Sequence, residues 1–394
     1  MNEWQETSLA DIAEYINGRA IRPEECSSEV GIPVIRIKQI NDPQSIDDHF
    51  CGDDLDEKNI VRCGDLLFSW SATLKTILWQ GATGAINQHI FKVIPKEGID
   101  QNFLYFLIDY FIPFLSEESH GSTMKHIKKS ALSAFRLKIP PLSEQKKIVK
   151  ILSSIDKLLE NYNKDILKHI NLKRALLNFF FSSSNLTNKD CPVYSMTQIA
   201  KGKYGIVDGP FGSNLKSEHY KESGIPVIQS GFVTTGKFSA KEYKFIDIKK
   251  YEEQIRSSVF PGDLVIAKIG ARAGTSALLP ENHLHGIIEG NCIKITPNKT
   301  LVKSKYLALL MEYLYQSGEL KKITNTTAQP AISMSQLKQI KLTLPPQEEQ
   351  IRMINFIEEI SNKIYLLEKN VSKISCVLKG ISHDLLSAQI RVNF

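Results

Sequence analysis

The feature that most constrains this chain is a proline motif that occurs twice, 205 residues apart. The run LKIPPLSEQKKIVKIL covers residues 137–152, and LTLPPQEEQIRMINFI covers residues 342–357. Both runs place two prolines and a Glu-Gln pair at the same positions, and both continue into an apolar pattern of helical spacing. The prolines stop a preceding strand, and the glutamate then lies in the first helical turn, where the helix dipole favours an anion.

Three shorter matches show that the repeat extends beyond this motif. LADIA at 9–13 returns as MTQIA at 196–200, GIPVI at 31–35 returns unchanged at 224–228, and GDL at 64–66 returns at 262–264. The matches keep their order, and their offset only grows along the chain, as it would if the second copy carried a few longer loops. The ordered set predicts two structurally equivalent halves.

Each half begins with short β-like runs mixed with helical ones, which predicts a compact α/β or α+β domain. The helical runs are NFLYFLIDYF at 102–111 and SKYLALLMEYLYQS at 304–317. The strand-like runs are IPVIRI, DLLFSW and HIFKVI in the first copy, and IPVIQS, DLVIAKI and NCIKIT in the second.

Each half ends in a long heptad pattern. From Met353 to Leu385, apolar residues alternate at spacings of four and three, and the equivalent positions from Ile148 to Phe180 share this seam except at His169 and Lys173. About 40 such residues make a helix of roughly 60 Å, and its apolar stripe needs a partner helix. The other copy is the nearest partner, so we expect an antiparallel pair. The alternative is that each helix packs on its own domain or on another subunit.

The predicted fold class is therefore α+β, with two α/β domains joined by a pair of long antiparallel coiled-coil helices in a pseudo-two-fold internal repeat. The expected boundaries are 1–142 for the first domain and 143–183 for the first helix. Residues 184–346 would hold a linker and the second domain, and 347–390 the second helix.

Composition narrows the class of protein without identifying a partner. The net charge of +6 and the pI near 8.8 permit a polyanionic partner but do not require one. The six cysteines contain no C-x-x-C pair and are expected to be reduced thiols. The N-terminus lacks the pattern of a secretion signal, and no apolar run is long enough to span a bilayer. We expect a cytoplasmic protein that does not associate with membranes.

Catalytic motifs are not visible. GPFGSNLKS at 209–217 has Leu215 where a P-loop needs glycine, and no strand-like apolar run precedes it. In HLHGIIEGNC, we interpret His283, His285, Glu289 and Cys292 as ordinary loop residues and not as a metal site. No G-x-G-x-x-G motif and no amino-methyltransferase tetrad are present. We expect no catalytic residue, bound metal or cofactor in this chain.

The remaining candidates are polar residues in the predicted loops, of the types that contact DNA. Arg, Lys, Asn and Gln pair with base edges, whereas Ser, Thr and backbone amides hold phosphates. For any one of these residues, a solvated loop position is an equally good interpretation. The predicted DNA-contacting residues are Arg36, Lys38, Ser122, Lys125, His126, Lys128, Ser213, Lys216, Gln229, Lys268, Arg272, Thr327 and Gln329.

The duplicated IPPLSEQKKIV and LPPQEEQIRMI runs, with the DGPFGSNLK and IPVI…GDL frames, resemble the specificity (S) subunit of type I restriction–modification systems over essentially the whole chain. The resemblance implies a non-catalytic subunit whose two target recognition domains read a bipartite double-stranded DNA site. It implies that the helices fix the spacing. It also implies two adenine-methyltransferase subunits that hold S-adenosylmethionine, and ATP-driven restriction (motor) subunits, as partners.

Three other interpretations stay open at this point. The chain could be the DNA-recognition subunit of a related methyltransferase or nuclease assembly outside type I. It could be a coiled-coil scaffold whose domains bind proteins. It could also be an enzyme whose site carries no familiar motif.

Overall fold

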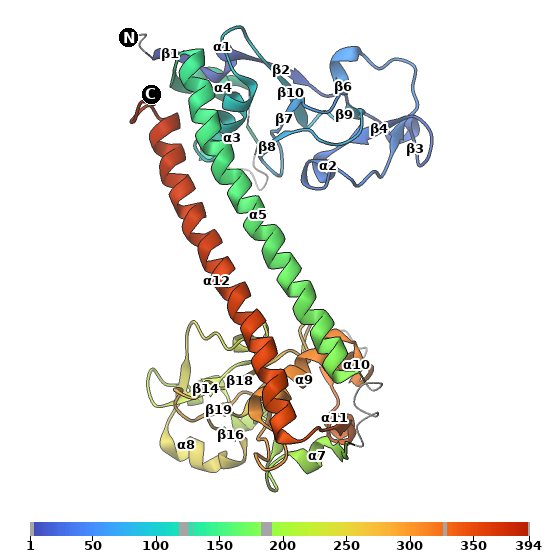
Figure 1. Cartoon of the computed structure of the whole chain (residues 1–394), viewed down its shortest axis with the longest axis vertical. Coiled ribbons are helices and arrows are strands. Elements are labelled where there is room, and N and C mark those ends of the chain that lie inside the picture. The colour runs from blue at the N-terminus through green and yellow to red at the C-terminus, as the bar shows by residue number, and fades with distance from the viewer. Residues whose placement is uncertain (1–3, 118–125, 128, 183–190, 326–328, 393–394) are drawn as a thin grey trace. The chain divides into compact units, whose positions relative to one another are not determined.

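The computed structural model describes residues 4–117, 126–127, 129–182, 191–325 and 329–392. The chain forms two compact units. Unit 1 contains Met1–Asn163 and Lys369–Phe394, and unit 2 contains Lys164–Glu368. Two 40-residue helices, α5 (Leu142–Phe181) and α12 (Gln347–Leu386), each contribute one part to each unit (Figure 1). No described helix combines the length and apolar character needed to cross a membrane.

The described residues in the globular part of unit 1 form three sheets. Their strand orders are β1-β11, β2-β10-β7-β8 and β3-β5-β4-β9-β6. All strand pairs are antiparallel except β4 with β9, which run parallel. The bounds are β1 Gln5–Ser8, β2 Ala13–Asn17, β3 Cys26–Ser27, β4 Ile32–Ile35, β5 His49–Phe50, β6 Ile60–Val61, β7 Leu66–Ser69, β8 Lys75–Leu78, β9 Gly84–Ile86, β10 Ile90–Pro95 and β11 Arg136–Ile139.

Unit 2 repeats this arrangement, except that its third sheet has no described strand equivalent to β3. Its orders are β12-β23, β13-β20-β17-β18 and β15-β14-β19-β16, again with one parallel pair, β14 with β19; a short β21-β22 pair is added. The bounds are β12 Val193–Ser195, β13 Ile206–Asp208, β14 Ile225–Ile228, β15 Lys244–Ile246, β16 Ser258–Val259, β17 Leu264–Ala267, β18 Ser276–Leu278, β19 Gly286–Ile288, β20 Cys292–Ile295, β21 Thr324–Asn325, β22 Ala331–Ile332 and β23 Lys341–Thr343.

Short helices accompany the strands. In unit 1 they are α1 Leu9–Ile12, α2 Ile37–Asn41, α3 Gln101–Glu117 and α4 Lys129–Ala134, with 3-10 turns η1 Pro23–Glu25 and η2 Glu57–Asn59. In unit 2 they are α7 Met196–Ile199, α8 Ile248–Glu253, α9 Ser304–Gln316, α10 Glu319–Lys322 and α11 Met334–Gln339, with η3 Gly212–Asn214, η4 Ser217–His219, η5 Ser230–Phe232 and η6 Ile255–Ser257.

The central strands β7 and β17 are buried on both faces, which explains their unbroken apolar sequences. Leu66 and Phe68 pack into the core that includes α3 and α5, whereas Leu67 packs into a second cluster with Trp79. In unit 2, Leu264 and Ile266 likewise pack into one core cluster, and Val265 packs into another.

The aspartate of each GDL motif makes a turn before the central strand. The Asp65 carboxylate accepts from the Arg62 backbone N–H at 2.7 Å and pairs with Lys92 Nζ at 2.9 Å. The Asp263 carboxylate accepts from the Phe260 N–H at 2.9 Å. Burial raises the pKa of Asp263, although the neighbouring Lys294 ammonium opposes this shift.

The glutamine of each proline motif joins its helix to the globular part of the fold. The Gln145 amide donates to the carbonyls of Gly98 at 3.0 Å and Pro140 at 2.9 Å, and accepts from the Asp100 N–H at 2.8 Å. The side chain is 1% exposed. The amide nitrogen therefore donates two hydrogen bonds and the amide oxygen accepts one, as a buried amide requires.

Unit 2 reproduces this arrangement atom for atom. The Gln350 amide donates to the carbonyls of Leu301 and Pro345, both at 2.9 Å, and accepts from the Lys303 N–H at 3.0 Å. The second proline carbonyl, at Pro141 or Pro346, accepts the first backbone bonds of each helix. The repeated letters of the motif thus encode a repeated hydrogen-bonded joint.

The glutamate of the first motif holds both ends of unit 1 together. Glu144 Oε2 accepts from Arg391 Nη2 at 2.8 Å and from Trp4 Nε1 at 3.2 Å, and Glu144 Oε1 accepts from the Val392 N–H at 3.0 Å. Its side chain is 7% exposed. Burial alone would raise the pKa of this carboxyl, but the hydrogen bonds from Arg391, Val392 and Trp4 outweigh burial and lower it.

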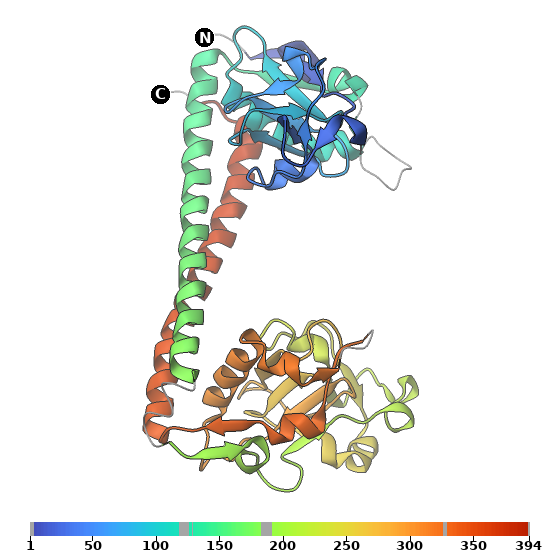
Figure 2. The ribbon, with the colours of Figure 1, turned by 90° about the vertical axis from the view of Figure 1, so that its right-hand side faces the viewer.

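The long helices run antiparallel inside each unit. In unit 1 the end of α12 lies beside the beginning of α5, and in unit 2 the end of α5 lies beside the beginning of α12 (Figures 1 and 2). In unit 2, for example, the rings of Phe180 and Phe356 lie 6.4 Å apart. All seam positions predicted in both helices are buried or half-buried. The interruption at Lys173 is explained by its ion pair with Glu312 of α9, at 2.7 Å.

The predicted fold class is confirmed, with one local correction. A strand, β13, ends directly before the GPFGSNLKS loop, where the sequence indicated none. It was missed because it has only three residues and lies between Gly205 and Gly209. The loop continues into short 3-10 turns and not into the α-helix that a P-loop requires.

We predict that Gln145→Ala lowers the free energy of unfolding of unit 1 by about 2–3 kcal/mol, because it leaves a buried N–H and two carbonyls without partners. All three tryptophans, Trp4, Trp70 and Trp79, belong to unit 1, so urea unfolding followed by tryptophan fluorescence reports on this unit. The matched control Lys146→Ala, at an exposed position, should change the value by less than about 0.5 kcal/mol. Equal effects of the two substitutions would refute the assigned role.

We predict that Glu144→Gln destabilises unit 1 near pH 7 by about 2 kcal/mol, because charge-assisted hydrogen bonds are lost. A lowered folded-state pKa means that the carboxylate stabilises fully above its ordinary pKa of 4.5, and that this contribution disappears as the pH falls through the lowered value. The stability difference between wild type and variant should therefore shrink in acid. A difference independent of pH between 7 and 3, or one matched by the exposed control Glu6→Gln, would contradict this account.

Candidate nucleic-acid interface

In unit 2, two loops from distant parts of the sequence are joined at one edge of the fold. Ile269 forms a β-bridge with Ala331, the Gly270 N–H donates to the Pro330 carbonyl at 2.8 Å, and the Ile332 N–H donates to the Lys268 carbonyl at 2.9 Å. The predicted residues Lys268, Arg272 and Gln329 are thereby brought together. Gly270 and Gly274 have positive φ of 100° and 99°, which lets the hairpin tip turn tightly around Arg272.

Lys268 is held inside this edge. Its ammonium lies 2.8 Å from Asp208 Oδ2 and 4.4 Å from the centre of the Phe211 ring, and its side chain is 15% exposed. Asp208 also pairs with Arg256 at 3.5 Å. Because these groups already satisfy the lysine, its first role is to fix the loop that follows β13.

The loop after β13 lies against the turn after β19. A Cβ on Gly209 would stand 2.1 Å from the Glu289 carbonyl oxygen, so only glycine permits this approach. The loop carries Ser213, which is exposed in η3, and Lys216, which precedes η4 and lies 3.8 Å from Glu218. Both candidates therefore belong to a loop with a defined backbone position.

Arg272 differs from Lys268 in its environment. It is exposed at the hairpin tip, and among the described residues no hydrogen bond or ion pair holds its guanidinium. Gln329 is also exposed, two residues before the bridge. These side chains are presented to solvent by the joined loops.

Unit 1 forms the same edge with different side chains. Ser71 bridges His126, and the Ile127 N–H donates to the Trp70 carbonyl at 3.0 Å. Trp70 thus occupies the backbone position of Lys268. Its ring lies 6.0 Å from that of His126 and 5.7 Å from that of His89. An aromatic cluster in unit 1 replaces the ionic cluster of unit 2.

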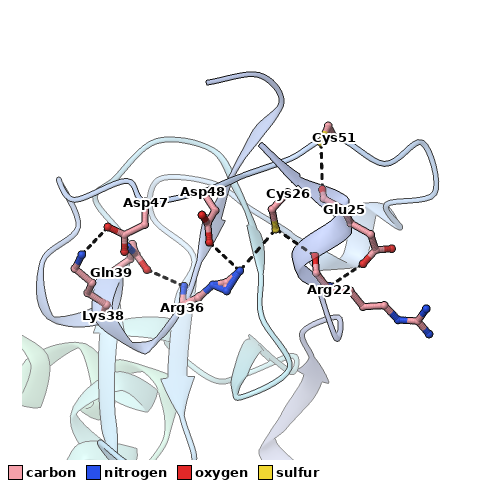
Figure 3. Close-up of polar contacts among 9 residues, drawn as sticks. All are labelled: Arg22, Glu25, Cys26, Arg36, Lys38, Gln39, Asp47, Asp48 and Cys51. Atoms are coloured by element: carbon pink, nitrogen blue, oxygen red, sulfur yellow. Dashed lines mark hydrogen bonds and ion pairs between the residues drawn. The ribbon is translucent and has the colours of Figure 1, made fainter. Parts of the chain in front are cut away.

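Arg36 and Lys38 follow strand β4 and are both paired with acidic residues (Figure 3). Arg36 Nη2 lies 3.0 Å from Asp48 Oδ2, and Lys38 Nζ lies 2.5 Å from Asp47 Oδ1. The buried Gln39 amide donates to Asp47 Oδ2 at 3.0 Å. The hydrogen bonds from Lys38 and Gln39 lower the pKa of Asp47. Both cations are therefore partly neutralised inside unit 1.

Gln229 is the unit 2 counterpart of Arg36, since both follow the IPVI strand directly. It is half-buried, and its carbonyl accepts from the Phe232 N–H at 3.0 Å. The same backbone position thus carries a cation in one unit and an amide in the other. Ser122, Lys125, Lys128 and Thr327 lie outside the described residues.

Trp70, Asp208 and Phe211 organise these edges and were not among the residues predicted from the sequence. A signal for Trp70 was available, because the offset of the GDL repeat aligns it with Lys268. Asp208 and Phe211 carry no such signal, since the first copy lacks the GPFG run.

The residues of HLHGIIEGNC lie in separate environments. His283 Nε2 is 2.8 Å from the Tyr243 hydroxyl, His285 stacks on Phe260, and the buried Cys292 thiol donates to the Ile228 carbonyl. Within the described ranges, no group of three or more histidine, cysteine or acidic side chains is arranged to hold a metal ion.

The comparison with known families decides the class of protein. The model of the type I restriction modification DNA specificity domain matches residues 1–172 and 212–375. The chain belongs to this family. The two matched segments cover the globular part of unit 1 and that of unit 2 from η3 onward, so this DNA specificity chain contains two recognition domains.

Individual relatives agree over nearly the whole chain. The MjaVIII type I specificity subunit of Methanocaldococcus jannaschii is 25% identical over 405 residues, covering 99% of this chain and 93% of that protein. The EcoBI specificity subunit of Escherichia coli is 20% identical over 419 residues, covering 99% and 86%.

Solved structures share the fold of this specificity chain. The type I S subunit from M. genitalium matches with a TM-score of 0.56 at 14% identity, covering 98% of this chain and 96% of that one. A chain from a study of complex assembly and conformational transition in a type I restriction–modification system gives 0.61 at 14% identity, covering 98% of both.

We predict that Arg272→Ala and Lys268→Ala have different effects on this specificity chain. Arg272→Ala should weaken binding to duplex DNA and reduce the salt slope by about one, without changing the unfolding free energy. Lys268→Ala should lower that free energy by about 1 kcal/mol, because Asp208 loses a partly buried partner. Salt-titrated binding and urea unfolding measured on both variants separate the two roles. If Arg272→Ala lowered the free energy of unfolding and Lys268→Ala did not, the roles assigned to these two residues would be reversed.

Proposed function

We propose that this chain is the non-catalytic, DNA-reading subunit of a type I restriction–modification complex. Each recognition unit reads one half of a bipartite double-stranded site, and the helices α5 and α12 set the distance between the halves. The observation that carries the proposal is the repeated frame with unlike side chains. Trp70 and Lys268, or Arg36 and Gln229, occupy the same backbone positions but offer different chemistry. Two such surfaces suit two different half-site sequences.

The residues proposed to contact DNA are the thirteen polar positions predicted from the sequence. Their exposure and their partners in the structure suit them to different roles. Arg272, Gln329, Ser213 and Lys216 are exposed on ordered loops and are the first candidates for base or phosphate contacts. Arg36 and Lys38 would have to break their ion pairs with Asp48 and Asp47 before they could contact DNA. Lys268 serves mainly to order its loop. Gln229 directly after β14 and His126 in the bridged edge of unit 1 are both half-buried.

The proposed partners are two methyltransferase subunits, and restriction (motor) subunits in the complete complex. S-adenosylmethionine and ATP would be held by those partners, and this chain would supply specificity alone. A solved chain of the same fold comes from a study of how a type I restriction–modification complex assembles, which supports this part of the proposal. A duplicated chain offers similar surfaces twice and is therefore suited to recruit two copies of one subunit.

Duplicating one heptad in each helix tests the proposal. Repeating Leu159–Asp165 in α5 and the equivalent Ile364–Asn370 in α12 keeps both seams in phase and adds about 10 Å to each helix. The unread spacer should lengthen by about three base pairs, while both half-site sequences stay unchanged. The readout is methylation-site mapping of DNA treated with the variant chain and the methyltransferase subunit of the same system. An unchanged spacer, or a change in either half-site, would contradict the proposed division of roles.

A further inference from the structure

Two cations that follow strand β4 in unit 1 are held by two neighbouring aspartates that precede β5 (Figure 3). Arg36 Nη2 lies 3.0 Å from Asp48 Oδ2, and Lys38 Nζ lies 2.5 Å from Asp47 Oδ1. The exposed fractions of these four side chains lie between 34% and 62%. An outside partner can therefore reach both pairs, and it must compete with a carboxylate for each cation.

The guanidinium of Arg36 is engaged at the nitrogen that matters most for paired hydrogen bonds. Nη2 belongs to both edges of the guanidinium fork, because it stands beside Nε on one edge and beside Nη1 on the other. Besides its ion pair with Asp48, this atom donates to Cys26 Sγ at 3.7 Å. A partner that needs two parallel hydrogen bonds from Arg36 must therefore displace Asp48 or Cys26.

The two aspartates differ in how firmly they are held. The buried Gln39 amide donates to Asp47 Oδ2 at 3.0 Å and accepts from the Arg36 backbone N–H at 3.1 Å. If Asp47 moved away, it would remove a partner from this buried amide, which is unfavourable. Among the described residues, Arg36 is the only ion-pair partner of the Asp48 carboxylate. Asp48 can therefore exchange, whereas Asp47 stays as a fixed negative charge.

The equivalent turn of unit 2 forms without such carboxylates. Gln229 occupies the position of Arg36, and residues 229–243 contain two lysines and one glutamate as their only charged residues. Within the part of the chain that the structure describes, no ion pair involves this turn. The frame shared by both units therefore does not require the two aspartates. Their presence in unit 1 points to a role in what this unit binds.

A carboxylate beside a cation discriminates between two ways of contacting a duplex. A backbone phosphate would only replace one anion by another, and its charge would be repelled by Asp47 and by the displaced Asp48. Guanine instead presents two neighbouring acceptors, N7 and O6, in the major groove, and arginine bonds to both at once. This contact brings no anion near the aspartates, so it compensates better for the lost ion pair.

We propose that Asp48 is a specificity-determining residue of unit 1, which keeps Arg36 from phosphates and releases it to a guanine in the half-site. Asp47, held by Gln39, supplies the fixed repulsion that rejects other contacts. This inference rests on the proposed function, in which unit 1 reads one half of the DNA site. It adds the base that Arg36 reads and the residue that excludes non-specific binding.

The test measures the affinity of the full chain, together with the methyltransferase subunit of the same system, for short duplexes. One duplex carries the complete site found by methylation mapping, and two others have one half scrambled. Arg36→Ala identifies the half that unit 1 reads, because selectivity should fall at a guanine of that half alone. Circular dichroism checks that each variant is folded.

Asp48→Asn keeps the shape of the side chain and removes its charge. This variant should bind the duplex with the unit 1 half scrambled about tenfold more tightly than wild type does, because Arg36 becomes available to a phosphate. The salt slope for that duplex should steepen by about one. Affinity for the complete site should change by less than about threefold, so that selectivity for this half falls. Selectivity for the other half should stay unchanged.

The matched control is Glu57→Gln, which makes the same change in charge within unit 1 and also removes the partner of a cation. Glu57 Oε1 lies 2.6 Å from Arg62 Nη2. The control should leave selectivity for both halves at the wild-type value. A double variant, Arg36→Ala with Asp48→Asn, should behave as Arg36→Ala alone, because Asp48 acts through Arg36.

Four outcomes would overturn the inference. Asp48→Asn could leave selectivity unchanged, or it could change both halves alike. Glu57→Gln could lower selectivity equally, which would indicate general electrostatics, or Asp48→Asn could keep its full effect without Arg36. If the wild-type assembly prefers no duplex sequence, the proposed function itself fails. That result differs from a selective wild type whose selectivity does not depend on Asp48.

Discussion

The buried glutamine amide at the start of each long helix is the interaction on which both units depend. A proline pair ends the preceding strand and leaves carbonyls that need donors, while the turn before α3 or α9 leaves a free N–H. The Gln145 and Gln350 amides meet both needs at once. Glutamate would lack the two donors and would bring a buried charge, and methionine would satisfy none of the groups. The direction in which each long helix leaves its globular part is thus set by the turn that begins α3 in unit 1 and α9 in unit 2.

This joint separates what must be constant in each unit from what is free to vary. Apart from β3, which has no described counterpart in unit 2, the strand order is the same in both units, and so are the parallel pair, the GDL turn and the glutamine. At the bridged edges, Ile127 and Ile332 belong to the core of their units, whereas other side chains there differ between the units. At one backbone position, Trp70 leans on the rings of His89 and His126, whereas Lys268 is held by Asp208 and Phe211. Each unit therefore orders its loops with different chemistry on an identical frame, as two domains of one DNA specificity chain require.

Much of the frame could be predicted because the sequence contains an internal repeat, so each motif of the frame occurs in two copies. The seam was identified in both helices, including the polar position at Lys173, although its partner Glu312 on α9 could not be foreseen. Strand β13 was missed because three residues between glycines give too little periodicity to detect. The ion pairs of Arg36 and Lys38 could not be predicted from the sequence either. Their partners, Asp48 and Asp47, come near only when β4 pairs with β5. Glu144 was correctly placed in the first helical turn, but its bonds to Trp4 and Arg391 depend on how the chain ends meet.

The distribution of paired cations bears on how such a chain would hold DNA. A cation that already holds a carboxylate adds little to phosphate neutralisation, because the acidic partner must be displaced or remains close to the backbone of the duplex. In unit 1, Arg19, Arg36 and Lys38 are all paired in this way. In unit 2, Arg272 stands exposed at a hairpin tip. The mildly basic net charge is thus a poor guide to the interface, because affinity depends on which cations are free of partners. Under the proposed function, Arg272 would therefore contribute more to phosphate neutralisation than Arg19, Arg36 or Lys38.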